Sequence, residues 1–227
     1  MKVCVLVTLS YNQPIYKEHQ RVWREFAHSH PDVTTYFVVS SPHCTQTIEI
    51  DDILITPGNE GYPDGKPSGA RLEKTIDALE WISNRNYDYV VRTGLSSLWI
   101  YSNLIDFLHT LPTINVYCGI DGGGFVSGAG IIMSKDIATM LCEHKVEACG
   151  FPYEEDVKIG ALMKQLHISQ TNASRFDIVS YEHYLRCLIP SNVYHFRVKF
   201  HNSDESIRKM ETTVMRHLLS RFKAIDR

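Results

Sequence analysis

The chain has 227 residues, of which 44% are hydrophobic and 22% are charged, which is the composition of a folded globular protein. Its formal net charge of −3 excludes a protein that coats nucleic acid, although local basic clusters could still bind a small phosphate compound. The best apolar run, residues 3–9, is too short to cross a membrane and lacks the cleavage site of a signal peptide. We therefore expect a cytoplasmic protein with no transmembrane segment.

The cysteines and histidines predict neither a disulfide framework nor a metal site. The six cysteines form no CxxC pair, and several lie inside apolar runs, which favours reduced, buried thiols over a disulfide framework. The eleven histidines show no convincing metal-ligand spacing.

The first half of the chain alternates predicted strands and helices. A continuous apolar run at residues 2–9 predicts a strand that is buried on both faces. Asn12 or Gln13 can then cap a helix that has Pro14 in its first turn and apolar residues at helical spacing up to Phe26. The next predicted elements are strands at 35–40 and 52–56, a loop rich in glycine and proline at 57–69, a helix at 71–84 and a strand at 87–92.

This alternation predicts an α/β fold with a mostly parallel sheet that is flanked by helices. Ligands of such sheets bind at the carboxyl ends of strands, so residues 8–12 and 92–97 are the first candidates for a site.

The second half of the chain is more mixed. Its predicted elements are a helix at 104–111, strands at 116–120 and 125–134, helices at 135–144 and 154–166, a strand-like segment at 194–199 and a C-terminal amphipathic helix. The C-terminal helix begins at the capping box Asn202-x-x-Glu205. No internal repeat or linker divides the chain, so we expect one domain over residues 1–227.

Two segments carry the most information about function. The first is Ser127-Gly128-Ala129-Gly130, which by itself indicates only that the backbone bends or lies close to another group. The second is Glu154-Glu155-Asp156, which is also explained by the preference of acidic residues for the start of a helix.

Together, in this order and at this spacing, the two segments resemble the β-1,3-galactosyltransferase and Fringe-like glycosyltransferases. In that group an S/C-G-G/A-G loop before an S-[RK]-D helix is followed by an E-D-V-x-x-G segment. Residues 92–97, Arg-Thr-Gly-Leu-Ser-Ser, also look like the R-T-N-[LI]-S-S of giant-virus glycosyltransferase-like proteins. The motifs that carry this resemblance lie within residues 71–166. Outside that range the resemblance rests only on the order of strands and helices. It implies a GT-A fold, and a viral source would fit.

The resemblance implies roles for the matching residues. Asp156 matches the catalytic base that takes a proton from the acceptor hydroxyl, and Glu155 is the second candidate. Ser127 to Gly130 match the loop at which the acceptor and the donor sugar approach the backbone. Residues 1–100 would be the half that binds the nucleotide-sugar, and residues 101–227 the acceptor half with the C-terminal helix.

The loop after the first strand holds the nucleotide in the family, and Thr8, Ser10 and Tyr11 match it here. The sequence departs from the family at Gly94-Leu95-Ser96, where relatives carry three aspartates that bind a divalent cation. Mn²⁺ and Mg²⁺ prefer carboxylate oxygens, and this segment offers none. The resemblance therefore implies a transferase without the usual metal motif.

A leaving diphosphate still needs positive charge. Alternation along the strand-like segment places His195, Arg197 and Lys199 on one face, where three basic groups could clamp a diphosphate with help from Arg92. The same pattern is typical of an edge strand with a solvated face. His195 could instead join Asp88 or Asp121 in an unconventional metal site.

Three further residues have two readings each. Lys74 reaches the donor or is an exposed helical charge, and the second is favoured. Trp99 stacks on an acceptor sugar or belongs to the core. Asp121 orients a sugar hydroxyl or belongs to an Asp-Gly turn.

The expected function is transfer of a sugar from a nucleotide-sugar, a UDP-sugar by preference, to a hydroxyl of a glycan or glycoconjugate. Inversion at the anomeric carbon is expected because the matched family inverts. The alternative is a degenerate, non-catalytic GT-A domain that binds a glycan or a nucleotide.

Overall fold

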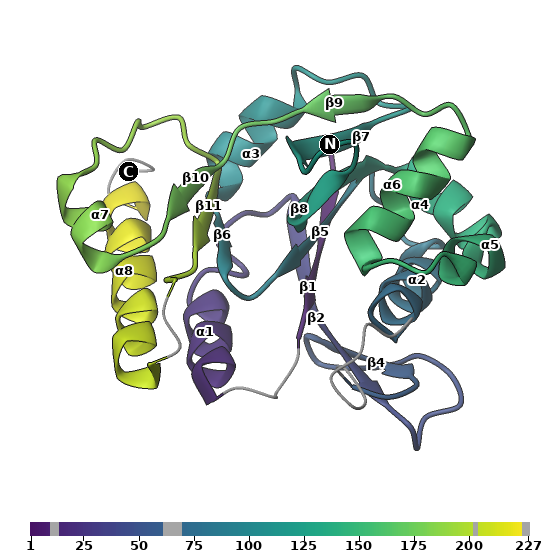
Figure 1. Ribbon diagram of the computed structural model, residues 1–227, viewed down its shortest axis with the longest axis horizontal. Coiled ribbons are helices and arrows are strands. Elements are labelled where there is room, and N and C mark those ends of the chain that lie inside the picture. The colour runs from purple at the N-terminus through teal and green to yellow at the C-terminus, as the bar shows by residue number, and fades with distance from the viewer. Residues whose placement is uncertain (10–13, 61–69, 202–203, 224–227) are drawn as a thin grey trace. The chain divides into compact units, whose positions relative to one another are not determined.

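The computed structural model describes residues 1–9, 14–60, 70–201 and 204–223, and Figure 1 shows their arrangement. Ser10 and Tyr11, which are predicted to bind the donor, lie outside these residues, as does Asn202 of the predicted capping box. The chain divides into two compact units. The first comprises Met1–Ser10, Asp32–Gly94 and Pro112–Ala173, and the second comprises Tyr11–Pro31, Leu95–Leu111 and Ser174–Arg227.

The first unit is built on an eight-stranded sheet with the strand order β3-β4-β2-β1-β5-β8-β7-β9. Parallel pairing joins β1 to β2 and β5, β2 to β4, and β7 to β9, whereas β3 and β8 run antiparallel to their neighbours. The strands are β1 (Val3–Thr8), β2 (Val33–Ser41), β3 (Ile48–Ile50), β4 (Ile53–Pro57), β5 (Tyr89–Gly94), β7 (Tyr117–Asp121), β8 (Val126–Ser134) and β9 (Gln170–Asn172).

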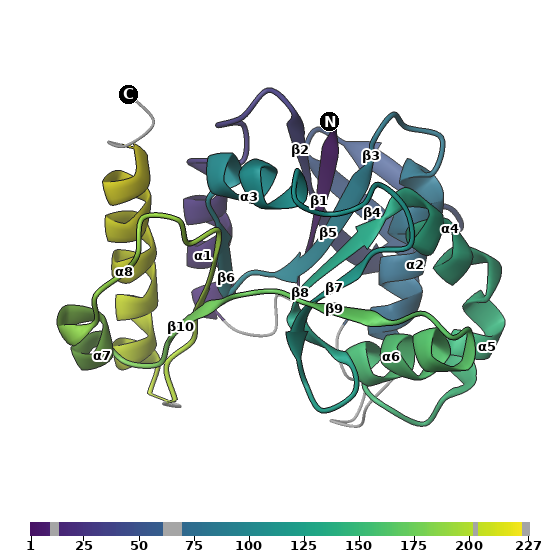
Figure 2. The ribbon, with the colours of Figure 1, turned by 90° about the horizontal axis from the view of Figure 1, so that it is seen from above.

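Four helices of the first unit lie together on one side of this sheet in Figures 1 and 2. They are α2 (Ala70–Ile82), α4 (Lys135–Glu143), α5 (Lys145–Gly150) and α6 (Glu155–Gln165). Leu72, Ile76 and Leu79 recur at helical spacing along α2 and are buried in one cluster with Leu6 and Val38 of the sheet. This apolar layer fixes the start of α2 and of α6 against the sheet.

The second unit has a three-stranded sheet with the order β10-β11-β6. Its strands are β6 (Ser97–Trp99), β10 (Phe176–Ile178) and β11 (His195–Val198), and its helices are α1 (Pro14–Arg24), α3 (Tyr101–Leu108), α7 (Tyr181–Arg186) and α8 (Glu205–Lys223). Helices α1 and α8 pack against each other. Aromatic rings fill the core, for example Phe26, which lies 4.9 Å from Trp23 and 5.7 Å from Tyr101 between ring centroids.

The structure confirms the predicted α/β class, with a mostly parallel sheet, flanking helices and a C-terminal helix. Asp204 is the N-cap residue of α8, because its Oδ1 accepts a 2.8 Å hydrogen bond from the Ser206 N–H. Four strands of three residues (β3, β6, β9 and β10) and two helices of six (α5 and α7) were not predicted from the sequence. Such elements are too short to show a period. No helix in the described part of the chain is long and apolar enough to cross a membrane.

Candidate functional site

The carboxyl ends of β1 and β5 lie side by side in the first unit, with Thr8 opposite Gly94. The Thr8 hydroxyl donates to the carbonyl oxygen of Thr93 over 3.1 Å, and the Thr93 hydroxyl donates to that of Ala129 over 2.7 Å. The strand end predicted to hold the donor is therefore joined to the glycine-containing acceptor segment, which the resemblance implied to be a loop and which lies within β8. Thr93, which makes this link, lies in the predicted range 92–97, although no role was predicted for it.

Two further predicted residues, Arg92 on β5 and Glu155 at the start of α6, form a buried ion pair. Arg92 also donates to the carbonyl oxygen of Gly128, and the Thr75 hydroxyl donates to Glu155 over 2.6 Å. Within the described residues, Arg92 Nε has no hydrogen-bond partner. A buried charge is tolerated when it is paired and hydrogen-bonded, so Glu155 holds Arg92 in place.

Asp156, the predicted base, lies directly beside this pair and is half-buried. Its Oδ2 accepts a 2.8 Å hydrogen bond from the Gly128 N–H, and its Oδ1 accepts one of 3.1 Å from the Val157 N–H. A Cβ atom on Gly128 would lie 3.0 Å from Asp156 Oδ2 and 3.3 Å from Arg92 Nη1. A side chain at position 128 would therefore press on the carboxylate and the guanidinium, which the glycine lets approach the β8 backbone closely.

Lys74 corrects an expectation, because it is buried rather than an exposed helical charge. Its ammonium donates to the carbonyl oxygen of Leu9 over 2.7 Å and to the Glu60 carboxylate over 2.9 and 3.0 Å. Glu60 in turn accepts from the Ser40 N–H. Burial lowers the pKa of Lys74, and the nearby Glu60 opposes that shift. The carboxyl ends of β1 and β2 are thus tied to α2 by a second buried charge network.

His195, in the second unit, is buried against Trp99, in a different setting from the ligand-facing cation predicted from strand alternation. The two rings stack with centroids 3.9 Å apart, and His195 Nε2 lies 3.2 Å from the Ser97 hydroxyl. Burial, and then the charges of Arg175 and Arg197, lower the pKa of His195 well below its usual 6.5. His195 is therefore neutral at pH 7 and brings no charge to a diphosphate.

Other predicted residues take up a range of positions. Arg197 on β11 is half-buried and Lys199, just beyond the strand, is exposed. Trp99 is a core residue, 1% exposed. Asp121 forms a turn, because its Oδ1 accepts 2.9 Å hydrogen bonds from the N–H groups of both Gly123 and Gly124.

The acidic residues considered for an unconventional metal site do not meet. Asp88 precedes β5 and Asp121 ends β7, and these strands both pair antiparallel to β8, so the two residues lie at opposite ends of the sheet. Asp88 accepts a 2.7 Å hydrogen bond from the Lys2 N–H. In the described ranges, no three His, Cys, Asp or Glu side chains gather as a metal ion would require.

No protein-family model matches this sequence, and no curated protein matches it. Solved structures do. One is a glycosyltransferase involved in the glycosylation of the major capsid of PBCV-1, with a TM-score of 0.57 and 10% identity over 94% of this chain and 99% of that one. Another is the galactosyltransferase LgtC in complex with donor and acceptor sugar analogues, with a TM-score of 0.52 and 12% identity over 96% of each chain. The chain therefore has the α/β fold of glycosyltransferases of the GT-A kind.

Proposed function

We propose that the protein is a glycosyltransferase that moves a sugar from a UDP-sugar to a hydroxyl of a glycan or glycoconjugate. The observation that carries the proposal is the meeting of Asp156, Gly128 and Arg92 beside the carboxyl end of β5. In an open α/β sheet this is the edge at which ligands bind. The likeness to glycosyltransferases over almost the whole chain gives that edge its chemistry.

Asp156 acts as the general base in this proposal. The acceptor hydroxyl attacks the anomeric carbon while the bond from that carbon to the diphosphate breaks, and the hydroxyl proton passes to the Asp156 carboxylate. Attack from the face opposite the leaving group inverts the configuration. The N–H groups of Gly128 and Val157 fix the orientation of this carboxylate, and its half-buried position leaves it open to a substrate.

The leaving diphosphate needs positive charge, and Arg92 supplies a guanidinium at the same strand end. Glu155, which pairs with Arg92, is a positioning residue in this scheme rather than a second base. Thr8 remains the candidate for donor binding on β1, and Arg197 and Lys199 remain predictions from the sequence. Because the segment 94–96 lacks carboxylates, we propose that the reaction proceeds without a divalent cation.

Real-time proton NMR with a panel of UDP-sugars tests the proposal without knowledge of the acceptor, since a transferase slowly passes its donor sugar to water. We expect release of UDP and of the inverted sugar anomer, unchanged by chelator. Asp156→Asn keeps the shape of the side chain and loses the base, so turnover falls about 10²- to 10⁴-fold. Asp106→Asn, an exposed site on α3, is the matched control.

The degenerate binding domain is the second candidate, and the loss of the acidic motif at Gly94-Leu95-Ser96 favours it. It predicts that UDP or a glycan binds with no release of sugar, and that Asp156→Asn changes neither affinity. Release of the retained anomer would contradict the inverting mechanism, and dependence on Mn²⁺ would contradict the metal-free one.

A further inference from the structure

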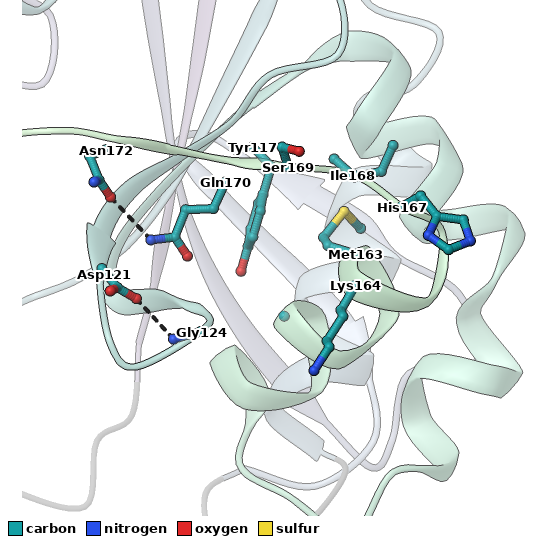
Figure 3. Close-up of a pocket in the computed structure, with 11 residues that line it drawn as sticks. Tyr117, Asp121, Gly124, Met163, Lys164, His167, Ile168, Ser169, Gln170 and Asn172 are labelled. Carbon is teal, nitrogen blue, oxygen red and sulfur yellow. Dashed lines mark hydrogen bonds between the residues drawn. The ribbon is translucent and has the colours of Figure 1, made fainter.

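The first unit contains a pocket of about 560 Å³ that the proposed reaction does not use (Figure 3). It lies where α6 runs beside β7 and β9, the last two strands at one edge of the sheet. Tyr117, which is 2% exposed, forms part of its lining and packs in the same core cluster as Met163. Its volume is within the range of ordinary small-molecule sites.

The lining of the pocket suits a neutral, polyhydroxylated ligand. Asp121 offers a carboxylate whose direction is fixed by the N–H groups of Gly123 and Gly124. Those hydrogen bonds lower the pKa of Asp121, which keeps it a charged acceptor that repels anions. Gln170 and Asn172 add amide groups that both donate and accept, as sugar hydroxyls do.

Tyr117 adds a donor from the floor of the pocket. Its hydroxyl oxygen accepts a 3.0 Å hydrogen bond from the Val126 N–H, so its own O–H is left to donate. Burial raises the pKa of Tyr117, and the charge of Asp156 raises it further, so the phenol stays protonated and lies within electrostatic reach of the proposed base. Figure 3 shows Tyr117 among Gln170, Met163 and the loop that carries Gly124.

The pocket is aligned with Asp156 along α6. Asp156, Gly160 and Lys164 are each four residues apart, which places them on one face of the helix. At 1.5 Å per residue, Gly160 lies about 6 Å and Lys164 about 12 Å from Asp156 along the axis. Phe125 packs against Gly160, where an added Cβ would clash with the Phe125 Cβ. A glycan whose reacting hydroxyl is at Asp156 would therefore pass over Phe125 and reach the pocket with its next one or two sugar residues.

We propose that this pocket is an acceptor subsite, which binds a neutral sugar residue next to the one that receives the transferred sugar. Asp121, Gln170, Asn172 and Tyr117 hydrogen-bond its hydroxyl groups. The inference rests on the proposed function, and it assigns the acceptor a place beside α6 in which Asp121 is the one lining residue that the sequence had suggested for a sugar hydroxyl.

Titration of the whole ¹⁵N-labelled chain with lactose, N-acetyllactosamine, maltose, cellobiose and chitobiose at millimolar concentration tests the subsite. We expect at least one disaccharide to bind saturably and to shift the side-chain amide signals of Gln170 and Asn172. Asn172→Ala should weaken binding about tenfold, because it removes hydrogen bonds to the sugar. Lys164→Trp, at the exposed rim, should block binding by filling the opening.

Asn84→Ala, at an exposed asparagine just after α2, is the matched control and should change nothing. UDP is titrated into each variant in parallel, and its affinity should stay constant. The subsite is overturned if none of the disaccharides binds, or if binding survives both Asn172→Ala and Lys164→Trp. Retained UDP binding in either case leaves the proposed function standing. A disaccharide that binds in the pocket of a chain unable to bind UDP supports the sugar site and contradicts the transferase.

Discussion

Each unit of the molecule contains a buried carboxylate with basic side chains beside it, and the two carboxylates have different surroundings. In the second unit, His19 of α1 lies 3.2 Å from Glu211 of α8, and both side chains are fully buried. Glu211 Oε1 also lies 3.1 Å from Arg208 Nε and accepts a 2.9 Å hydrogen bond from the Phe200 N–H. In the first unit, Arg92 and Glu155 lie beside the glycine-containing part of β8 and the half-buried Asp156. A buried charge alone therefore does not indicate a functional site. The half-buried Asp156 carboxylate beside the buried pair is what indicates one in the first unit.

The largest expected effect is on stability, from Glu211→Ala. Glu211 is fully buried, and its removal takes away the carboxylate partner of Arg208 and the acceptor of the buried Phe200 N–H, so the free energy of unfolding should fall by about 3 to 5 kcal/mol. Urea unfolding followed by circular dichroism measures this. Glu18→Ala is the control on the same helix as His19: its pair with Arg21 is exposed and should contribute less than about 1 kcal/mol. Equal losses would refute a structural role for the buried pair.

A second prediction concerns pH and His195. Its pKa is lower in the folded than in the unfolded chain, so below about pH 6.5 the unfolded chain binds one more proton. The contribution of His195 to the free energy of unfolding is therefore complete above that pH, and the free energy of unfolding falls by about 1.4 kcal/mol for each pH unit below it. His195→Phe, which keeps a ring on Trp99, should remove this slope, whereas His109→Gln at an exposed site should not. An unchanged slope in His195→Phe would contradict the buried, neutral imidazole.

The smallest expected effect on stability belongs to Gly128→Ala, about 1 kcal/mol. Its added Cβ would press on Asp156 and on Arg92, so the two side chains must shift. We expect turnover of the donor to fall about tenfold or more, since a small displacement of the reacting groups is costly. Gly150→Ala has no neighbour within 4 Å of the added Cβ and serves as the control. A normal rate in Gly128→Ala would show that this part of β8 does not align the base.

The sequence was sufficient to predict the layers of the first unit. Continuous apolar runs such as residues 3–8 mark strands that are buried on both faces. The prediction of such a strand does not depend on which elements pack against it. It also placed Asp156 at the start of a helix after a glycine-containing strand, and these two segments do meet. The predicted halves, 1–100 and 101–227, follow chain order, whereas the two units interleave segments from all parts of the chain.

Pairings between distant charges could not be predicted. Arg92 and Glu155 are 63 residues apart, so no local pattern reveals that they form an ion pair. Lys74 lies among apolar residues of α2, yet its burial depends on Glu60 and on the Leu9 carbonyl, which the helix pattern does not contain. His195 alternates with Arg197, as a solvated strand would show, but Trp99 on the neighbouring strand covers it.

The most direct test of the central claim is hydrogen–deuterium exchange of the whole chain with and without UDP, in the presence of chelator. The account predicts slower exchange at residues 92–94, 126–130 and 154–158, around the carboxyl end of β5. The opposite end of the sheet, at residues 84–88, should be unchanged and serves as the internal control. Protection confined to other segments, or no protection by UDP at all, would contradict a metal-free donor site at Arg92 and Asp156.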